Sequence, residues 1–203
     1  MSLAIRPALA DDRQALSRIC LLTANAGTDA SDLYADPEYP GLVWSVPYLQ
    51  FAPENCFVLA DGQEVVGYVV GTPDTATYER RLDEAWWPVL ADKYTDRTTT
   101  GASDSGVLDR IREPRHSDPG IIQAYPAHLH INLLPQAQSG GWGRRMIETE
   151  LDSLRKSGAP AVHLGLSLTN DRALGFYQHL GFSEIGRGEA IWMGMDLQDK
   201  RVL

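Results

Sequence analysis

The stretch LLPQAQSGGWGRR, residues 133–145, decides the fold of this chain. An apolar strand ends in it, a glycine-rich turn follows, and a helix begins at Trp142. The first turn of a helix has free backbone N–H groups and the positive end of the helix dipole, and glycine lets the main chain approach a ligand closely. Arg144 and Arg145 add positive charge nearby. The stretch therefore indicates a binding site for a phosphate group.

Two familiar phosphate loops do not fit this stretch. A Walker loop ends in Gly-Lys-Ser/Thr, which the stretch lacks. A dinucleotide loop of the form GxGxxG is absent too, because the glycines fall at Gly140, Gly141 and Gly143. A plain tight turn between a strand and a helix stays open as the alternative to a binding loop.

Two motifs resemble those of the GCN5-related N-acetyltransferases (GNAT). The spacing Gln138-x-x-Gly141-x-Gly143 resembles Q/R-x-x-G-x-G/A, the pyrophosphate loop of that family. The stretch NDRALGFYQHLGF, residues 170–182, resembles the family motif N-x-x-A-x-x-x-Y followed by x-x-L-G-F. The two motifs occur in the family's order, and the pattern covers residues 5–197. The resemblance implies the GNAT fold and acetyl-CoA (CoA) as the cofactor.

A second resemblance lies outside these motifs. Residues 33–41, residues 67–72 and the run Trp86-Trp87-Pro88 are similar to the C-terminal acetyltransferase-like domain of eukaryotic O-GlcNAc hydrolases. In that domain the pyrophosphate loop is degenerate, whereas here it keeps three glycines. The resemblance implies a stand-alone relative that still binds acetyl-CoA.

The glycine and proline residues elsewhere in the chain mark the ends of further strands and helices. Their order predicts one mixed sheet with helices packed on it, which is the α/β (α+β) fold class. Asp61-Gly62 predicts a β-hairpin turn, Gly67 predicts a bulge or bend, and Pro88 is expected to kink or split a helical stretch. We expect a single domain over residues 1–203, with a mostly antiparallel sheet and a helical insert at about residues 76–118 between the third and fourth strands. Strands are expected at residues 3–7, 57–61, 64–71, 128–134, 161–168, 182–186 and 190–197, and helices after residue 11 and at residues 77–94, 107–111, 142–156 and 170–180.

Composition narrows the function classes. The chain has 203 residues, 43% of them hydrophobic. Its 27 acidic and 18 basic residues give a net charge of -9, which argues against a nucleic-acid partner.

No apolar run reaches the roughly 18 residues of a membrane span, and the first twelve residues do not form a signal peptide. We therefore expect no membrane partner and a cytoplasmic location. Cys20 and Cys56 are expected to be buried and inert, and no spacing suggests a metal site.

The resemblance implies a set of cofactor-binding residues. Backbone amides of the glycine loop would hold the pyrophosphate, the strand before it would pair with the pantetheine arm, and the downstream helix would flank the cofactor. Asn170 is alternatively only a helix N-cap, and Phe176 is alternatively only a core aromatic residue. The implied residues are Leu133, Leu134, Gln138, Ser139, Gly140, Gly141, Trp142, Gly143, Arg144, Asn170, Ala173, Phe176 and Tyr177.

Catalysis needs an oxyanion donor, a general acid and a base. A backbone N–H at Leu133 or Leu134 is the expected donor, with a bulge nearby to splay the sheet. Tyr177 matches the family's general-acid tyrosine, or is alternatively a half-buried core residue. The fourth strand carries no carboxylate, so His128 and His130 are the candidate bases, or two structural histidines.

The acceptor side is less defined by the sequence. The loop of residues 32–39 and the aromatic residues Trp86, Trp87 and Tyr94 are expected to wall a cleft for an amine, although both tryptophans alternatively anchor the insert on the core. The run 110–116 is expected to be a solvated surface. We expect an N-acetyltransferase that acts on a small amine or, as a second choice, a protein lysine, as a monomer or homodimer. The alternatives are a non-catalytic acetyl-CoA-binding module and an interaction domain without cofactor.

Overall fold

A seven-stranded sheet runs through the computed structural model, which describes residues 2–138 and 140–198. Its strand order is β1-β2-β3-β4-β5-β7-β6, and only β4 and β5 pair in parallel. The expected mixed, mostly antiparallel sheet is therefore confirmed. The strands are β1 (Leu3–Pro7), β2 (Cys56–Asp61), β3 (Glu64–Thr72), β4 (Ala127–Leu133), β5 (Ala161–Leu166), β6 (Ser183–Arg187) and β7 (Ile191–Asp196).

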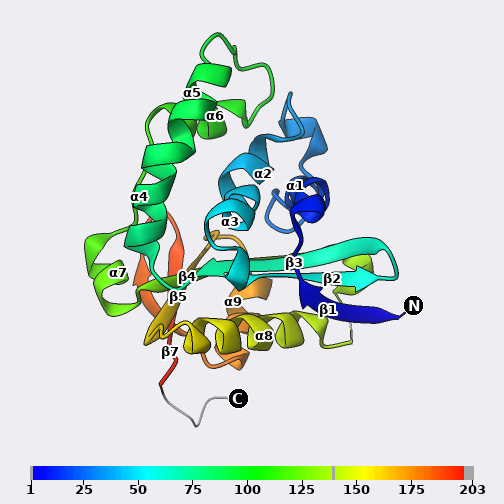
Figure 1. Ribbon diagram of the computed structural model, residues 1–203, viewed down its shortest axis with the longest axis vertical. Helices are drawn as coiled ribbons and strands as arrows, with labels where there is room; N and C mark the ends of the chain where they lie inside the picture. The colour runs from blue at the N-terminus through cyan, green and yellow to red at the C-terminus, as the bar shows by residue number, and fades with distance from the viewer. Residues whose placement is uncertain (1, 139, 199–203) are drawn as a thin grey trace.

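Helices cover both faces of the sheet (Figure 1). Three of them lie above β3 in this view: α1 (Arg13–Leu21), α2 (Tyr39–Trp44) and α3 (Val46–Phe51). Below lies α8 (Trp142–Lys156), whose buried side packs against β2, β3 and β4. After β5 comes α9 (Asp171–His179), and Gly143 at the start of α8 lies against Phe176 of α9. The two helices that carry the predicted motifs are thus brought together at one end of the sheet.

The hairpin of β2 and β3 forms as expected. Gly62 adopts a positive φ of 60° in the turn. The register shifts where Leu59 pairs with Gly67 and Ala60 with Val65, so β3 bulges at the glycine, as predicted. The bulge strengthens the local twist of the strand that pairs with β4.

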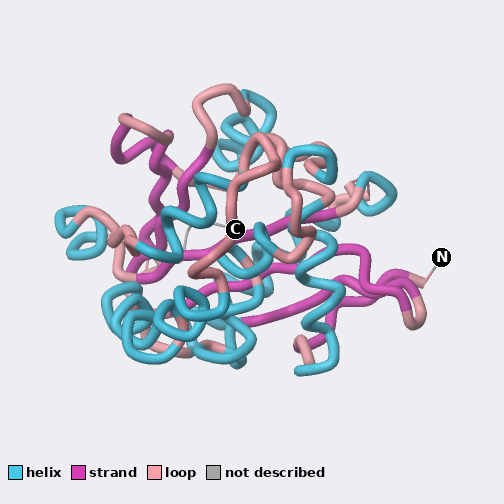
Figure 2. The backbone as a smooth tube through the Cα atoms, turned by 90° about the horizontal axis from the view of Figure 1, so that it is seen from above, coloured by secondary structure: helices cyan, strands magenta, loops and turns pink. Residues whose placement is uncertain are grey.

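A helical insert connects β3 to β4 and rises from the sheet as the green column of Figure 1. Its helices are α4 (Thr75–Ala85), α5 (Trp87–Lys93), α6 (Asp104–Arg112) and α7 (Pro119–Ala124). Pro88 divides α4 from α5, as expected, while α7 was not expected and lengthens the insert beyond residue 118. Figure 2 shows these helices and the strands from above.

The insert is fastened to the body of the protein by Asp104. This buried carboxylate accepts hydrogen bonds from the backbone amides of Ala35 (3.0 Å), Thr100 (3.0 Å) and Gly101 (2.7 Å). These bonds lower the pKa of Asp104 although burial opposes the shift. The loop before α2 and the insert are therefore held in a fixed relation.

The parallel pair of β4 and β5 is short. Ala127 pairs with Val162 and His128 with His163, and beyond these two pairs the strands diverge. The splay expected of the sheet is present, but the bulge expected near residues 132–134 is not: β4 keeps an unbroken register with β3 from His128 to Leu133. Divergence of β5, rather than a bulge in β4, opens the sheet.

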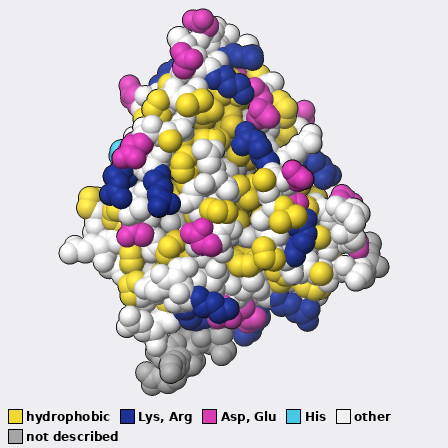
Figure 3. All heavy atoms as spheres, viewed as in Figure 1, with side chains coloured by type: hydrophobic (Ala, Val, Ile, Leu, Met, Phe, Trp, Pro, Cys, Tyr) yellow, Lys and Arg dark blue, Asp and Glu magenta, His cyan; other side chains and the backbone are white. Residues whose placement is uncertain are grey.

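The outer surface has mixed character. On the face drawn in Figure 3, positive and negative side chains alternate with apolar ones. Among the described residues no helix is both long and apolar enough to cross a membrane. The cytoplasmic location and the single-domain organisation stay predictions.

Candidate active site

Three adjoining chambers follow the gap between β4 and β5. The loop chamber, about 370 Å³, includes Thr28, Gln138, Gly141, Trp142, Gly143, Arg144 and Arg172. The middle chamber, about 460 Å³, shares Thr23, Asn132, Asn170 and Tyr177 with the loop chamber. The insert chamber, about 340 Å³, shares Trp44, His130 and Ser167 with the middle one. The three chambers of this cleft therefore adjoin one another in order from the glycine loop to the helical insert.

The start of α8 presents uncapped amides to the loop chamber. Gly140 and Gly141 have φ of 72° and 77°, and Gly141 occupies the N-cap position, where it has no side chain to cap the helix. The first helical backbone bond is donated by Arg145 to the carbonyl of Gly141. The amides of residues 142–144 have no acceptor within the described residues. Among the described residues no acceptor competes with an anion for these amides, and the helix dipole supports anion binding.

Gln138 fastens this loop rather than offering its own amide. Its backbone N–H donates to Pro135 (3.2 Å), and its side-chain Nε2 donates to the carbonyl of Leu133 (2.9 Å). Its Oε1 accepts a hydrogen bond from Arg172 (3.2 Å). The row of free amides was expected to start at Gln138, but the amide of Gln138 is already bonded within the protein. Ser139 lies outside the described residues.

The edge of β4 that faces the gap carries free backbone groups. Leu134 donates its amide to Val66 of β3 (2.9 Å), which contradicts its expected availability as an oxyanion donor. Hydrogen-bonded pairs alternate in an antiparallel ladder, so the amides of Ile131 and Leu133 point away from β3, toward β5. Because β5 has diverged there, these amides are open to the cleft.

The N-terminus of α9 borders the loop and middle chambers. Asn170 caps the helix, since its Oδ1 accepts from the amide of Ala173 (3.0 Å). The cap leaves its Nδ2 without a partner in the described chain, so Asn170 can serve both expected purposes. Ala173 lines both chambers, and Phe176 lines the loop chamber.

Tyr177 extends from α9 to the boundary of the same two chambers. Its ring packs against Phe176 and Phe182 and is 7% exposed. Burial raises the pKa of its hydroxyl, which therefore stays protonated at neutral pH. No hydrogen bond from this hydroxyl occurs within the described residues, so its proton is available for donation.

His128 has both ring nitrogens engaged. Thr75 donates its only hydroxyl proton to the carbonyl of Pro126 (2.6 Å), so Nδ1 of His128 donates to Thr75 (2.7 Å). Nε2 then accepts from Tyr48 (2.6 Å). Burial is the largest cause that lowers the pKa of His128, which is neutral in the fold. This histidine has no nitrogen left for a substrate.

His130 differs from its neighbour in its exposure and in its hydrogen bonding. It is partly exposed, it lines both the middle and the insert chambers, and no hydrogen bond occupies its ring within the described chain. Burial and the nearby charge of Arg110 lower its pKa to about 4. It is therefore neutral at pH 7, with a ring nitrogen left free by the described residues but a basicity below that of an ordinary histidine.

Asn132 follows on the same face of β4. Its Nδ2 donates to the hydroxyl of Thr23, and its Oδ1 accepts from Tyr68 (3.2 Å). Thr23 in turn donates to the carbonyl of Ile19 (2.7 Å). This chain of bonds orients the amide at the centre of the cleft and leaves no titratable group at this position.

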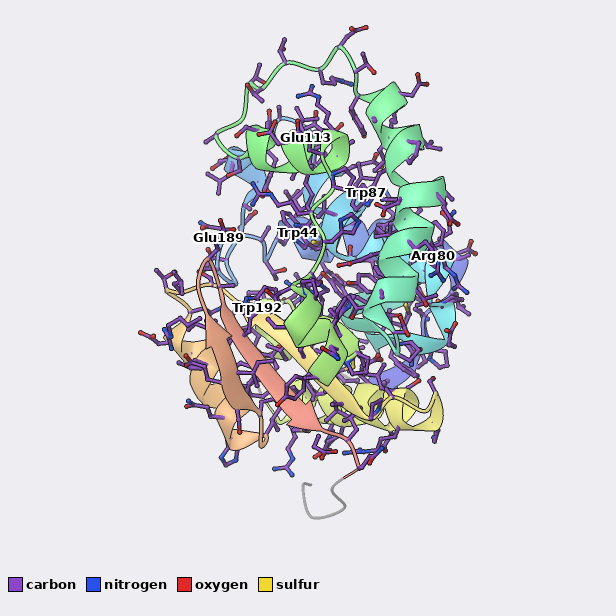
Figure 4. The ribbon with its side chains drawn as sticks, turned by 90° about the vertical axis from the view of Figure 1, so that its left-hand side faces the viewer. Trp44, Arg80, Trp87, Glu113, Glu189 and Trp192 are labelled. Atoms are coloured by element: carbon purple, nitrogen blue, oxygen red, sulfur yellow. The ribbon has the colours of Figure 1, made fainter. Side chains whose placement is uncertain are left out.

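The insert chamber faces the side shown in Figure 4, where Trp44 and Trp87 lie above Trp192, and Glu189 lies to the left at about the level of Trp44. The loop of residues 32–39 does not line it, contrary to expectation: Tyr39 packs edge-on against Tyr94 in the core. Trp86 is likewise buried, and its Nε1 donates to Leu42 (3.0 Å).

Several lining residues were not singled out from the sequence. The turn after α1 contributes Thr23 and Thr28, while Glu79, Arg110 and Arg172 come from the insert and α9. Arg172 could have been predicted as a lining residue, because it lies within the motif at residues 170–182. The others carry no local signal, and Arg110 contradicts the expectation that run 110–116 is solvated, since its Nε is buried.

Residues 118–182 match the model of the acetyltransferase (GNAT) family. Over 98% of its length the chain also matches all of a protein named SsHAT in its crystal structure, with 37% identity and a TM-score of 0.85. This chain belongs to the GNAT family, and its fold is the GNAT fold.

Two further relatives place it within the family. The chain is 24% identical over 195 residues to protein O-GlcNAcase of Rattus norvegicus, covering 91% of this chain and 20% of that protein, so it spans about one fifth of that relative's length. The resemblance to O-GlcNAc hydrolases is thereby confirmed. The putative acetyltransferase yncA from Salmonella typhimurium, solved with its cofactor acetyl-CoA, shares the fold at 15% identity and a TM-score of 0.56, with coverage of 100% of this chain and 98% of that one.

Proposed function

We propose that this protein is an acetyl-CoA-dependent N-acetyltransferase that moves an acetyl group to an amine by direct attack in a ternary complex. One observation carries the proposal: adjoining chambers lie in order from the uncapped amides of α8, past the open edge of β4, to a separate chamber under the insert. Such a cleft allows two ligands to enter from opposite ends and meet at its centre.

The loop chamber fits acetyl-CoA in chemistry. The free amides of residues 142–144 suit a pyrophosphate, and Gly141 leaves open space where a side chain would otherwise project. The open amides of Ile131 and Leu133 suit the amide groups of a pantetheine arm, by strand addition. The bound cofactor would supply a thioester carbonyl to the amine, which forms a C–N bond as the C–S bond breaks.

Two residues of the middle chamber each carry out one of the two proton transfers that the reaction needs. His130 accepts the proton that the amine loses, because its ring is neutral and unoccupied. Tyr177 donates its proton to the leaving sulfur, and burial keeps that proton in place until it is needed. The amide of Leu133 is the candidate oxyanion donor, since that of Leu134 is already bonded to Val66. His128 holds Tyr48 and Thr75 together as a positioning residue.

The alternative is an acetyl-CoA-binding module without catalysis. It is favoured by one observation, that β4 offers an amide at Asn132 and no carboxylate along its length. The cleft would then serve to bind cofactor and a partner.

A thiol-release assay tests the proposal. The protein is incubated with acetyl-CoA and a broad panel of amines, and free thiol is titrated over time; calorimetry with CoA measures cofactor binding separately. Acceptor-dependent thiol release supports transfer. Tight CoA binding with silence across the panel supports the non-catalytic module, and no heat with CoA refutes both.

A further inference from the structure

The charges in the insert chamber are unevenly paired. Each acid that lines it already has a partner: Glu79 accepts from the amide and hydroxyl of Ser117 (2.9 and 2.7 Å), and Asp83 pairs with His116 (2.8 Å). Glu189 pairs with Arg115 (3.5 Å). Each acidic residue of the chamber therefore has a partner in the protein, and that of Glu189 is an exposed ion pair.

Arg110 of α6 is the exception among the charged residues of this chamber. No carboxylate lies within ion-pair distance of its guanidinium among the described residues, and its Nε is buried without a hydrogen-bond partner. Its Nη2 makes only a long contact, 3.5 Å, with the carbonyl of Arg115. Desolvation lowers the pKa of Arg110, but a guanidinium stays charged at neutral pH. The charge of Glu79 partly offsets this desolvation from beyond ion-pair distance. A partly buried cation without a direct ion-pair partner is stabilised further when a ligand supplies an anion.

The position of this cation relates it to the proposed reaction centre. Arg110 lines the insert chamber together with His130, and its charge contributes to the lowered pKa of that histidine. An anion bound by Arg110 would thus lie in the same chamber as the amine that His130 deprotonates. A guanidinium binds a carboxylate through two parallel N–H···O bonds, which fixes the orientation of the ligand. The chamber that would hold the ligand also has apolar walls, which Trp44, Trp87 and Trp192 supply (Figure 4).

We propose that the acceptor is an amine that also carries a carboxylate, and that Arg110 binds this carboxylate in the insert chamber. This inference rests on the proposed acetyl transfer. It distinguishes amino-acid-like acceptors from plain amines, from polyamines and from the side chain of a lysine within a peptide. The apolar walls further favour an aromatic or aliphatic group on the same molecule.

The test compares matched acceptors that differ in the carboxylate: phenylalanine with phenethylamine, tryptophan with tryptamine, and 4-aminobutyrate with butylamine. For at least one pair we expect the acid to be the better substrate in kcat/KM by about tenfold or more. Arg110→Gln is expected to remove that preference through a higher KM for the acid, while the plain amine keeps its rate. Arg110→Lys keeps the positive charge but cannot form two parallel hydrogen bonds to a carboxylate. This variant is expected to retain part of the preference for the acid over the plain amine.

Arg112→Gln is the matched control, because Arg112 is an exposed arginine of the same helix that lies outside the chamber. It is expected to leave both kinetics and the melting temperature unchanged. If no pair favours the acid, if a lysine peptide is preferred to every acid, or if Arg110→Gln slows acid and plain amine equally, the inference is overturned.

Calorimetry separates this inference from the proposed function. The same six compounds are titrated into CoA-loaded protein. Binding of an acid that weakens about tenfold or more in Arg110→Gln, with CoA affinity unchanged, supports the carboxylate site even where no acetyl transfer occurs. Acids that bind no better than their plain amines overturn it, whereas failure of CoA itself to bind refutes the proposed function.

Discussion

The hydroxyl of Tyr48 lies 2.6 Å from Nε2 of His128, which joins the helix α3 to the strand β4 through a buried hydrogen bond. Together with Thr75 on the other ring nitrogen, this bond makes His128 part of the scaffold. The neighbouring His130, two residues further along the same face of β4, lines the cleft instead. The two histidines of one motif therefore have different expected behaviour on substitution.

The first prediction separates these two histidines. His128→Gln is expected to lower the free energy of unfolding by about 1–3 kcal/mol, because buried partners lose their hydrogen bonds. His130→Gln is expected to lower kcat by about tenfold or more with little change in stability or CoA affinity. Urea denaturation and steady-state kinetics on both variants measure this. Equal kinetic losses in two stably folded variants would contradict the assignment.

The second prediction concerns pH. Since the pKa of His130 is lowered to about 4, its ring is unprotonated above that value and is lost as an acceptor only when the pH falls through it. We expect kcat/KM, expressed per neutral amine, to be constant from pH 8 to pH 6 and to fall only below about pH 5. An inflection near pH 6.5, the ordinary histidine value, would show that His130 is not desolvated as described.

The third prediction concerns Tyr177. Tyr177→Phe removes the hydroxyl and keeps the ring packed against Phe182. We expect kcat to fall by about tenfold or more, with CoA affinity nearly unchanged. The control is Tyr34→Phe, which removes a hydroxyl from a residue outside all three chambers. Parent and variant with the same turnover would favour the non-catalytic module.

The fourth prediction tests the glycine loop. Gly141→Glu places a side chain and a negative charge in the open space before α8, so CoA binding is expected to be lost. Its control is Gly158→Glu, because Gly158 also has a positive φ, 86°, and open space around it, but lies at the other end of α8. Calorimetry is expected to show normal CoA affinity for the control. Micromolar affinity retained in Gly141→Glu would refute the location of the pyrophosphate.

The fifth prediction uses Glu150, whose buried carboxyl has no hydrogen-bond partner in the described chain. Desolvation raises its pKa well above the ordinary value, so the folded state binds a proton that the unfolded state releases. The stability of the parent is therefore expected to fall by about 1.4 kcal/mol per pH unit between the unfolded and folded pKa values, as pH rises. Glu150→Gln lacks this slope. Urea denaturation at pH 5.5, 6.5 and 7.5 measures the difference, and parallel curves would contradict it.

The sequence predicts the sheet and the loop well because their signals are local. Glycine at a positive φ and proline within the first turn of a helix mark the boundaries of α8, α9 and α5 directly. The short α7 was missed, because Ile121 and Ile122 in a six-residue helix resemble the start of the strand that follows. The motif residues Gly141, Asn170 and Tyr177 do meet at the loop chamber.

The acceptor side was not predictable in the same way. Whether His128 or His130 is free depends on Tyr48 and Thr75, which lie 80 and 53 residues from His128 in the chain. Likewise Arg110 stands in a charged run whose composition is typical of a surface, and only the tertiary packing of α6, which contacts α2 and α5, buries its Nε. Such differences arise from tertiary contacts, for which neither residue type nor spacing carries a signal.

The short pairing of β4 with β5 has a consequence for solvent exchange. Amides at the centre of a closed sheet are protected from deuterium, but those of Ile131 and Leu133 face a gap and are expected to exchange early. A ligand seated along this edge would add the missing neighbour and slow their exchange. The open part of the β4 edge would thus be paired only in the liganded protein, and the occupant would act as a short additional strand between β4 and β5.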